Sequence, residues 1–158
     1  MTTQQAADAY KRYLETLSPL SLSELDSYVT PDVKFADPFN DVHGVGAMRH
    51  IFDDMFRTVS NIEFKADCMG VDRSTALMAW TFSGELRGRS FMLNGMSRIT
   101  FDASGRVTAH IDHWDSATQF YMQLPVIGWL LSIVRRRVAA HWNRSIFFAD
   151  LRVATRVC

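Results

Sequence analysis

Apolar residues recur every three or four positions in the first third of the chain, and they alternate with polar residues later on. Helical spacing over residues 4–17 predicts a first helix with one apolar face, which Ser18-Pro19 ends. A second, short helix is expected over residues 21–29 and a third over residues 48–59. The chain therefore begins with helices that each have one side to bury.

From residue 61 the hydrophobic period changes from 3.6 to 2, which is typical of strands. Four strands are expected, at residues 61–71, 75–86, 89–101 and 106–115, and the polar breaks between them read as hairpin connections. Helices followed by a run of antiparallel strands indicate an α+β fold, in which a curved sheet closes over the helices.

Alternation also shows which side chains share a face of the last strand. His110, Asp112 and Trp114 lie on the same side, and Ser97 shares a face of the strand before with Leu93 and Ile99. Such a polar group is either exposed to solvent or forms the polar end of an apolar cavity. His110 and Asp112 stand two residues apart, so the carboxylate can orient or charge the imidazole, as a proton-transfer site requires. A buried structural pair gives the same pattern.

Asp37 in "VKFADPFNDVHG" continues the alternation of Val33 and Phe35. An acid that points into an apolar interior is costly unless it is paired or protonated. Asp37 is therefore a candidate general base. The alternative is that Asp37 has a structural role, because an Asp-Pro pair also favours the start of a turn.

Charge and length narrow the class of protein. The 158 residues suit one domain, and 17 basic residues balance 17 acidic ones, which argues against a nucleic-acid partner. The first residues show no basic stretch followed by an apolar one, and the apolar run at 120–134 is too short for a membrane span. Cys68 and Cys158 are expected to be unbridged, so a cytoplasmic protein is expected.

Cofactor signatures are lacking in the sequence. No set of His, Asp and Glu has metal-ligand spacing, and there is no phosphate-binding loop or nucleophile elbow. We therefore expect neither a metal nor a cofactor.

Three motifs carry a resemblance to a known group of proteins: "KRYLETL" in the first helix, "VKFADPFNDVHG" before the third, and the late "HWD". Over residues 5–118 their order resembles the nuclear transport factor two-like superfamily, which includes ketosteroid isomerase and the SnoaL-like polyketide cyclases. The resemblance implies a cone-shaped domain over residues 1–118, with a strongly curved, mostly antiparallel sheet wrapped around the N-terminal helices. It also implies a deep apolar pocket and a homodimer through the outer sheet face.

The resemblance to ketosteroid isomerase also implies roles for individual residues. Asp37 matches the proton-shuttling aspartate and Tyr13 the oxyanion-hole tyrosine. Ser97 falls where that enzyme has a protonated aspartic acid, and a serine is a weaker donor, which argues against steroid isomerisation. With His110 and Asp112, these residues form the set of candidate catalytic residues.

Aromatic residues are expected to line the pocket, although the same residues could form plain core. The candidates are Phe35, Phe39, Phe52, Phe56, Trp80, Phe82, Phe91 and Trp114. The expected ligand is a small lipophilic molecule, polycyclic or polyketide-like, and the expected reaction is cofactor-independent acid/base chemistry of the isomerase, cyclase or dehydratase type. The alternatives are a non-enzymatic carrier of a lipophilic ligand and a protein-interaction module.

Residues 119–158 extend beyond the cone domain. An apolar run is followed by Arg135–Arg137, and residues 135–158 hold six arginines against one acid, Asp150. We expect a helical extension that packs on the same domain and covers the pocket mouth or the dimer seam. The alternative is peripheral membrane contact through residues 120–137.

Overall fold

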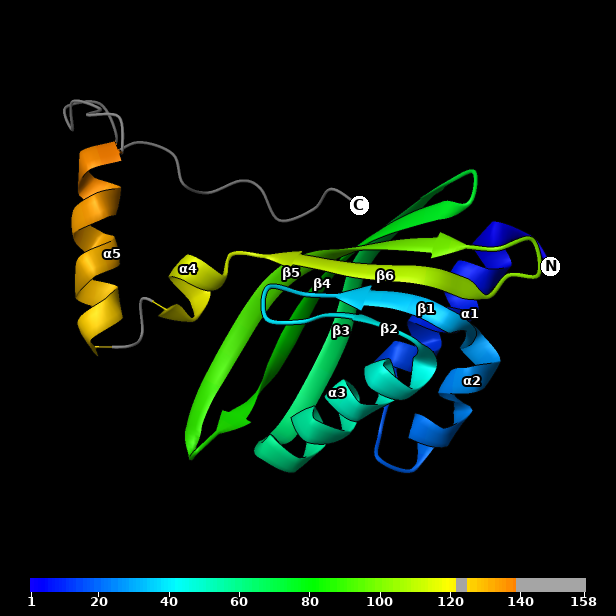
Figure 1. Ribbon diagram of the computed structural model, residues 1–158, viewed down its shortest axis with the longest axis horizontal. Coiled ribbons are helices and arrows are strands. Elements are labelled where there is room, and N and C mark those ends of the chain that lie inside the picture. Colours follow the sequence, from blue (N-terminus) through cyan, green and yellow to red (C-terminus); the bar gives the residue numbers. More distant parts are fainter. Residues whose placement is uncertain (122–124, 139–158) are drawn as a thin grey trace. The chain divides into compact units, whose positions relative to one another are not determined.

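The computed structural model describes residues 1–121 and 125–138. The chain divides into two compact units, Met1–Asp115 and Ser116–Cys158. The first unit begins with helix α1 (Thr3–Glu15), a 3-10 turn η1 (Ser21–Glu24), a short helix α2 (Leu25–Tyr28) and, after two strands, helix α3 (Val45–Thr58). These helices lie together on one side of a curved sheet (Figure 1).

Six strands form this sheet: β1 (Val29–Ala36), β2 (Asp41–His43), β3 (Val59–Asp72), β4 (Thr75–Leu86), β5 (Arg89–Phe101) and β6 (Val107–Trp114). Their order is β2-β1-β6-β5-β4-β3, and the sheet is not closed. Every neighbouring pair is antiparallel except β1 and β6, which run parallel. The expected fold class, a strongly curved and mostly antiparallel sheet around N-terminal helices, is confirmed.

The start of β1 differs from the sequence expectation. Residues 21–28 form the 3-10 turn and one helical turn, and the strand already begins at Val29. It contains Pro31, which has no N–H for a strand ladder. The pairing of β1 with β6 shifts register between Val29 and Lys34, so Pro31 falls in the irregular stretch.

Helix α1 begins with a capping box. The hydroxyl of Thr2 accepts from the backbone N–H of Gln5, and the Gln5 side chain accepts from the backbone N–H of Thr2. This satisfies two donors that the first helical turn leaves free. The same helix buries one face, which consists of Ala6, Ala7, Tyr10, Tyr13 and Leu14.

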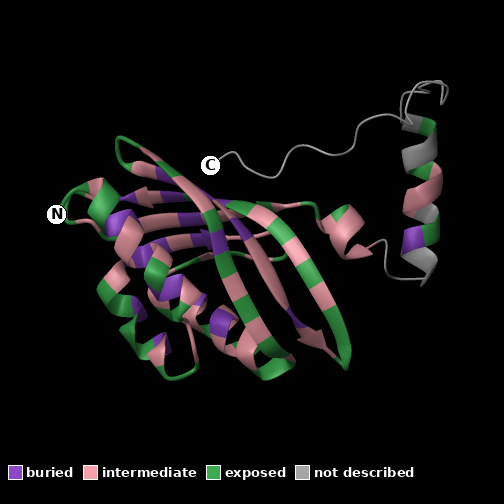
Figure 2. Cartoon of the chain, turned by 180° about the vertical axis from the view of Figure 1, so that it is seen from behind, coloured by how far each residue is buried: buried purple, intermediate pink, exposed green. Residues whose placement is uncertain are grey.

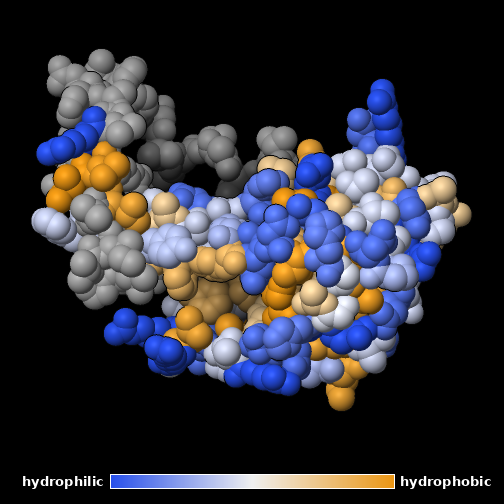
Figure 3. Space-filling model, viewed as in Figure 1, coloured by the Kyte–Doolittle hydropathy of each residue, from blue (hydrophilic) through white to orange (hydrophobic). Residues whose placement is uncertain are grey.

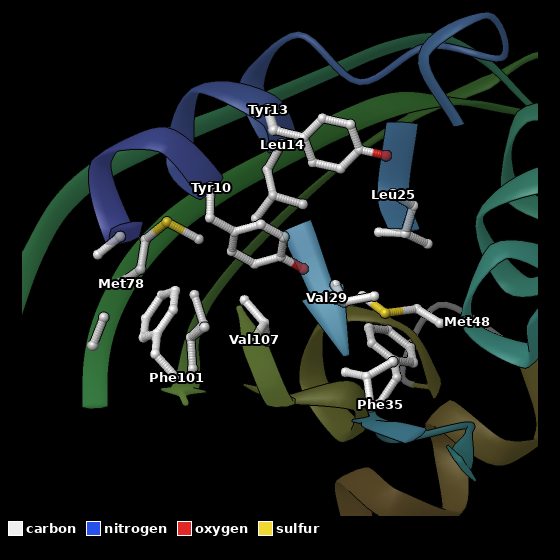
Figure 4. Close-up of a cluster of buried hydrophobic side chains, with 14 of the residues drawn as sticks. Tyr10, Tyr13, Leu14, Leu25, Val29, Phe35, Met48, Met78, Phe101 and Val107 are labelled. Carbon is white, nitrogen blue, oxygen red and sulfur yellow. The ribbon is translucent and has the colours of Figure 1, made fainter. Parts of the chain in front are cut away.

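The core of the first unit fills the space between the helices and the concave face of the sheet (Figure 4). Buried positions alternate with more exposed ones along β4 and β5, so only one face of these strands contributes (Figure 2). Fully buried members include Leu25, Val33, Met48, Met78 and Val107. Burying each such side chain stabilises the fold by about 1.5–3 kcal/mol.

The outer face of the same strands carries exposed apolar side chains. Leu77, Met92 and Met96 are 50%, 63% and 45% exposed, and each alternates with inward-facing neighbours along its strand. This is the face through which the resemblance implies a homodimer, and the homodimer stays a prediction.

The second unit contains helix α4 (Ser116–Gln119) and helix α5 (Pro125–Val138). In the described part of the chain, no helix has both the length and the apolar character needed to cross a membrane. That the extension packs on the first unit stays a prediction. Cys158 and Asp150 lie outside the described residues. Cys68 on β3 is not a free cysteine in the structure, so the expectation that it is unbridged is wrong.

Gly95 is a point of close packing inside the sheet. A Cβ atom built there would lie 2.5 Å from ring atoms of Trp80 and 3.0 Å from the Cβ of Trp114. The indole of Trp80 on β4 therefore lies directly over the Gly95 backbone on β5.

Gly95→Ala should lower the free energy of unfolding by about 1–3 kcal/mol, because the added methyl group displaces the Trp80 ring. Urea unfolding would measure this. Gly70→Ala is the matched control, since a Cβ there meets nothing within 4 Å, and its effect should stay within about 0.5 kcal/mol. Equal values for the two variants would contradict this account of the packing.

Candidate functional site

His110 on β6 forms hydrogen bonds through both ring nitrogens. Its Nδ1 lies 2.8 Å from the hydroxyl of Tyr10 on α1. Its Nε2 lies 2.9 Å from Oδ1 of Asp112 and 3.2 Å from the hydroxyl of Ser97 on β5. A helix and two strands therefore converge on one imidazole.

Two further hydrogen bonds complete the group. The Ser97 hydroxyl donates to Asp112 Oδ1 at 2.5 Å, and the indole N–H of Trp80 donates to the Ser97 hydroxyl oxygen at 2.8 Å. We call Tyr10, Trp80, Ser97, His110 and Asp112 the His110 network. Tyr10, Ser97 and His110 are almost completely buried, whereas the side chain of Asp112 is 20% exposed.

The hydrogen-bond donors determine where the protons lie. Burial, together with the charge of Asp112, raises the pKa of Tyr10 well above its usual value, so this phenol keeps its proton. Among the described residues, Nδ1 of His110 is the one acceptor for that proton. Nδ1 therefore carries no hydrogen, and the neutral ring donates its Nε2–H to Asp112. A charged ring would leave the buried Tyr10 hydroxyl without an acceptor, which costs about 1–3 kcal/mol.

The two carboxylate oxygens of Asp112 differ in their hydrogen bonding. Oδ1 accepts from both Ser97 and His110. Oδ2 has no hydrogen-bond donor within the described part of the chain, and the side chain is partly accessible. The carboxylate is thus held in orientation by one oxygen, while the other can reach a bound molecule.

The structure places Asp37 in the turn after β1, outside the His110 network. Its Oδ1 accepts from the backbone N–H groups of Phe39 and Asn40, both at 2.7 Å, and the Asn40 amide contacts both carboxylate oxygens. This is the turn geometry that Asp-Pro favours. Because Ala36 pairs with Ile111, Asp37 lies at the level of Asp112 along the sheet.

Tyr13 is also outside the network. Its hydroxyl donates to the carbonyl of Ser21 at 3.2 Å, and its ring stacks on Tyr28 with centroids 4.3 Å apart. Burial, and then the nearby charge of Glu24, raise the pKa of Tyr13 to about 12. Tyr10, one turn earlier on the same helix face, makes the contact with the site. Tyr10 and Tyr13 both belong to the buried face of α1, and nothing in the sequence shows which hydroxyl reaches His110, so this contact of Tyr10 was not predicted.

Two of the expected pocket residues, Phe35 and Trp80, lie at the network. Phe35 lies edge-on to His110, with centroids 5.5 Å apart, and also contacts Phe52. Trp80 belongs to the network itself. Elsewhere Phe39 contacts Trp114 and Phe82 contacts Phe91, and Phe56 packs against the core from a half-buried position.

A groove of about 420 Å³ is lined by Asn61, Ser83, Gly84, Glu85, Ser90, Phe91 and Met92. Phe91 is the expected pocket residue that it includes. Figure 3 also shows one face of the molecule hollowed, with apolar side chains around the hollow. Within residues 1–121 and 125–138, no group of three His, Cys, Asp or Glu side chains could hold a metal ion.

Tyr10→Phe should destabilise the protein by about 1–3 kcal/mol, because Nδ1 of His110 loses its buried donor. It should also change the ¹⁵N chemical shift of His110 Nδ1, because this nitrogen no longer accepts a hydrogen bond. Tyr13→Phe removes a hydroxyl of the same type from the same helix and should leave this shift unchanged. Unaltered His110 shifts in Tyr10→Phe would disprove the proton assignment.

The raised pKa values of Tyr10 and Tyr13 predict alkaline destabilisation. Above a pH of about 10 the unfolded chain loses tyrosine protons that the folded protein keeps. Stability is therefore fully present below that pH and falls as the pH rises toward 12, the folded pKa of Tyr13. Urea unfolding across this range should show the fall, with a smaller slope in Tyr13→Phe. A constant free energy of unfolding would contradict the pKa shifts.

Comparison with known proteins is consistent with this architecture. The family model of the SnoaL-like domain matches residues 10–110 of this chain. No curated protein matches the chain. An LEH-like epoxide hydrolase from M. tuberculosis is 17% identical with a TM-score of 0.62, covering 84% of this chain and 91% of that one. An NTF2-like protein of unknown function from Burkholderia pseudomallei is 16% identical with a TM-score of 0.63, covering 73% and 92%.

A SnoaL-like polyketide cyclase from Agrobacterium tumefaciens is 17% identical with a TM-score of 0.63, covering 78% of this chain and 98% of that one. At these identities, likeness shows the fold alone. The expected membership of the nuclear transport factor two-like superfamily is confirmed. Because the family match spans more than half of the chain, this protein belongs to the SnoaL-like domain family.

Proposed function

We propose that the protein binds a small lipophilic molecule and moves a proton on it without a cofactor, with Asp112 as the general base. The observation that carries the proposal is the asymmetry of this carboxylate. Two donors hold Oδ1, while Oδ2 has no donor among the described residues and belongs to a side chain that is 20% exposed. A positioned base needs this combination of fixed orientation and one reachable oxygen.

In the reaction, Oδ2 takes a proton from a carbon next to a carbonyl group of the ligand. The electron pair of the broken C–H bond moves toward the carbonyl oxygen, and Asp112 then returns the proton at another atom of the same molecule. Such a step serves isomerisation, cyclisation and dehydration alike. Ser97 and His110 keep Oδ2 aimed by holding Oδ1.

The aromatic surroundings favour a lipophilic ligand. Phe35 lies beside His110, and Trp80 beside Ser97. Side chains of this kind exclude water, which strengthens the electrostatic interactions of the carboxylate. The name of the polyketide cyclase relative fits a polycyclic or polyketide-like substrate, and that of the epoxide hydrolase fits acid/base chemistry.

Asp37 is the second candidate base, and the geometry favours it less. Both of its oxygens accept hydrogen bonds within the β1–β2 turn, so a proton transfer would compete with that turn. Tyr13 and Ser97, the candidate oxyanion donors, direct their hydroxyl protons to Ser21 and Asp112. In this proposal Ser97 positions the base.

The first step of the test is a tryptophan-fluorescence titration against steroids, polycyclic phenols, polyketide-like compounds and terpenoids. Saturable quenching that weakens in Trp80→Ala identifies the ligand class to assay. Asp112→Asn should then lower turnover by about two to four orders of magnitude. Asp37→Asn is the matched control and should lower turnover less than about tenfold while reducing stability.

If Asp112→Asn lowers turnover less than threefold, Asp112 is not the general base. A large loss of turnover confined to Asp37→Asn would assign that role to Asp37. Saturable binding without any product would favour a carrier of a lipophilic molecule. Failure of every compound class to bind would favour the protein-interaction module.

A further inference from the structure

Trp80 on β4 reaches diagonally across the sheet to Ser97 on β5. Trp80 pairs directly with Gly95, whereas Ser97 pairs with Met78, so the indole and the hydroxyl are diagonal neighbours, a separation that an aromatic side chain can span. The indole N–H donates to the Ser97 hydroxyl oxygen at 2.8 Å. Because Trp80 is 5% exposed and Ser97 is fully buried, this hydrogen bond is shielded from water.

Gly95 leaves the space that the indole needs for this reach. A Cβ atom at Gly95 would lie 2.5 Å from two ring atoms of Trp80, so any side chain there would displace the indole. The ring of Phe64 on β3 lies beside Trp80, with centroids 5.8 Å apart. The position of the indole N–H is therefore determined by a glycine on one neighbouring strand and an aromatic ring on the other.

The Ser97 hydroxyl has three hydrogen-bond neighbours and one proton. Oδ1 of Asp112 can only accept, and the indole of Trp80 can only donate. Nε2 of His110, at 3.2 Å, is a donor in the tautomer that Tyr10 sets. The Ser97 proton is thus directed to Asp112. His110 also bonds Asp112, so Trp80 is the donor that binds Ser97 alone.

We propose that Trp80 is a positioning residue, whose indole N–H holds the Ser97 hydroxyl in the rotamer that donates to Asp112 and thereby aims the second oxygen of Asp112 at the ligand. This inference rests on the proposed function, in which Asp112 is the general base. Without the indole N–H, the Ser97 oxygen is free to accept the Nε2–H of His110. Asp112 then loses part of the hold on Oδ1 that orients it.

Nitrogen NMR of the His110 ring tests this step without a ligand. In Trp80→Phe the Nε2 resonance should move, because the Nε2–H turns from Asp112 toward the Ser97 oxygen that has lost its donor. The Nδ1 resonance should stay where it is, since the bond from Tyr10 is intact.

Two further variants separate the hydrogen bond from packing. Gly95→Ala keeps the indole N–H but displaces the ring, so it should move the Nε2 resonance of His110 as Trp80→Phe does. Phe64→Leu is the matched control, because it removes the ring beside Trp80 and no hydrogen bond. It should leave both His110 resonances unchanged.

Turnover of the compound class found in the fluorescence titration gives the second readout. Trp80→Phe should lower kcat roughly threefold to tenfold, the rate equivalent of one net hydrogen bond, and change KM less than about twofold. Ser97→Ala should lower kcat at least as much. Adding Trp80→Phe to Ser97→Ala should lower it less than about twofold further, because Trp80 acts through Ser97. Phe64→Leu should keep kcat within about twofold.

Three results would overturn the proposal: an unchanged Nε2 resonance in Trp80→Phe, the same movement in Phe64→Leu, and additive losses of kcat in the double variant. If Trp80→Phe fails to fold, the indole ¹H–¹⁵N resonance of Trp80 in Ser97→Ala replaces it. That resonance should move, and an unchanged one would also overturn the proposal.

Failure of the proposed function is distinguishable from failure of this inference. If Asp112→Asn keeps its turnover, Asp112 is not the base and Trp80 has no role in turnover, even where the Nε2 resonance of Trp80→Phe moves. An unchanged Nε2 resonance removes the role of Trp80 alone and leaves that of Asp112 in place.

Discussion

A hydrogen bond from Tyr10 on α1 to Nδ1 of His110 on β6 joins the helical layer to the sheet inside the apolar core. Hydrophobic packing is not directional, so by itself it allows a helix to slide or rotate over a sheet face. A buried hydroxyl must keep its hydrogen-bond acceptor, so the Tyr10–His110 bond opposes sliding and rotation of the helix. The bond therefore fixes the position of α1 on the sheet and, through the ring, the tautomer that His110 presents to Asp112.

The change of hydrophobic period was enough to predict the fold class. It also placed His110 and Asp112 on one face of the last strand, because alternation within a strand is a local property. The parallel pairing of β1 with β6 could not be read in this way, since it depends on two segments about 75 residues apart. The second helix is expected to reach residue 29, whereas in the structure β1 already begins at Val29 and contains Pro31 in its irregular part.

The site was predicted less completely than the fold, and Tyr10 and Tyr13 show why. Both belong to the buried face of α1, so the sequence pattern treats them alike. Which hydroxyl reaches His110 depends on how far along its axis α1 is placed over the sheet, which is a tertiary property. Asp37 was similarly ambiguous, because the same residue can face a pocket or begin a turn. Asp37 accepts hydrogen bonds from the backbone N–H groups of Phe39 and Asn40. These groups come close to its carboxylate only once the turn has formed.

The partners of the Tyr10–His110 bond are 100 residues apart, and this separation has a consequence for how the protein is made. The N-terminal half emerges from the ribosome first, yet β1 lacks its parallel partner and α1 its polar contact until β6 has been synthesised. Pairings between distant segments form slowly, because the loop between them must be closed first. Until then β1 and the inner face of β5 present apolar surface to the cell. The completion of β6, rather than of any helix, is thus the event that ends the period in which the nascent chain is prone to aggregate.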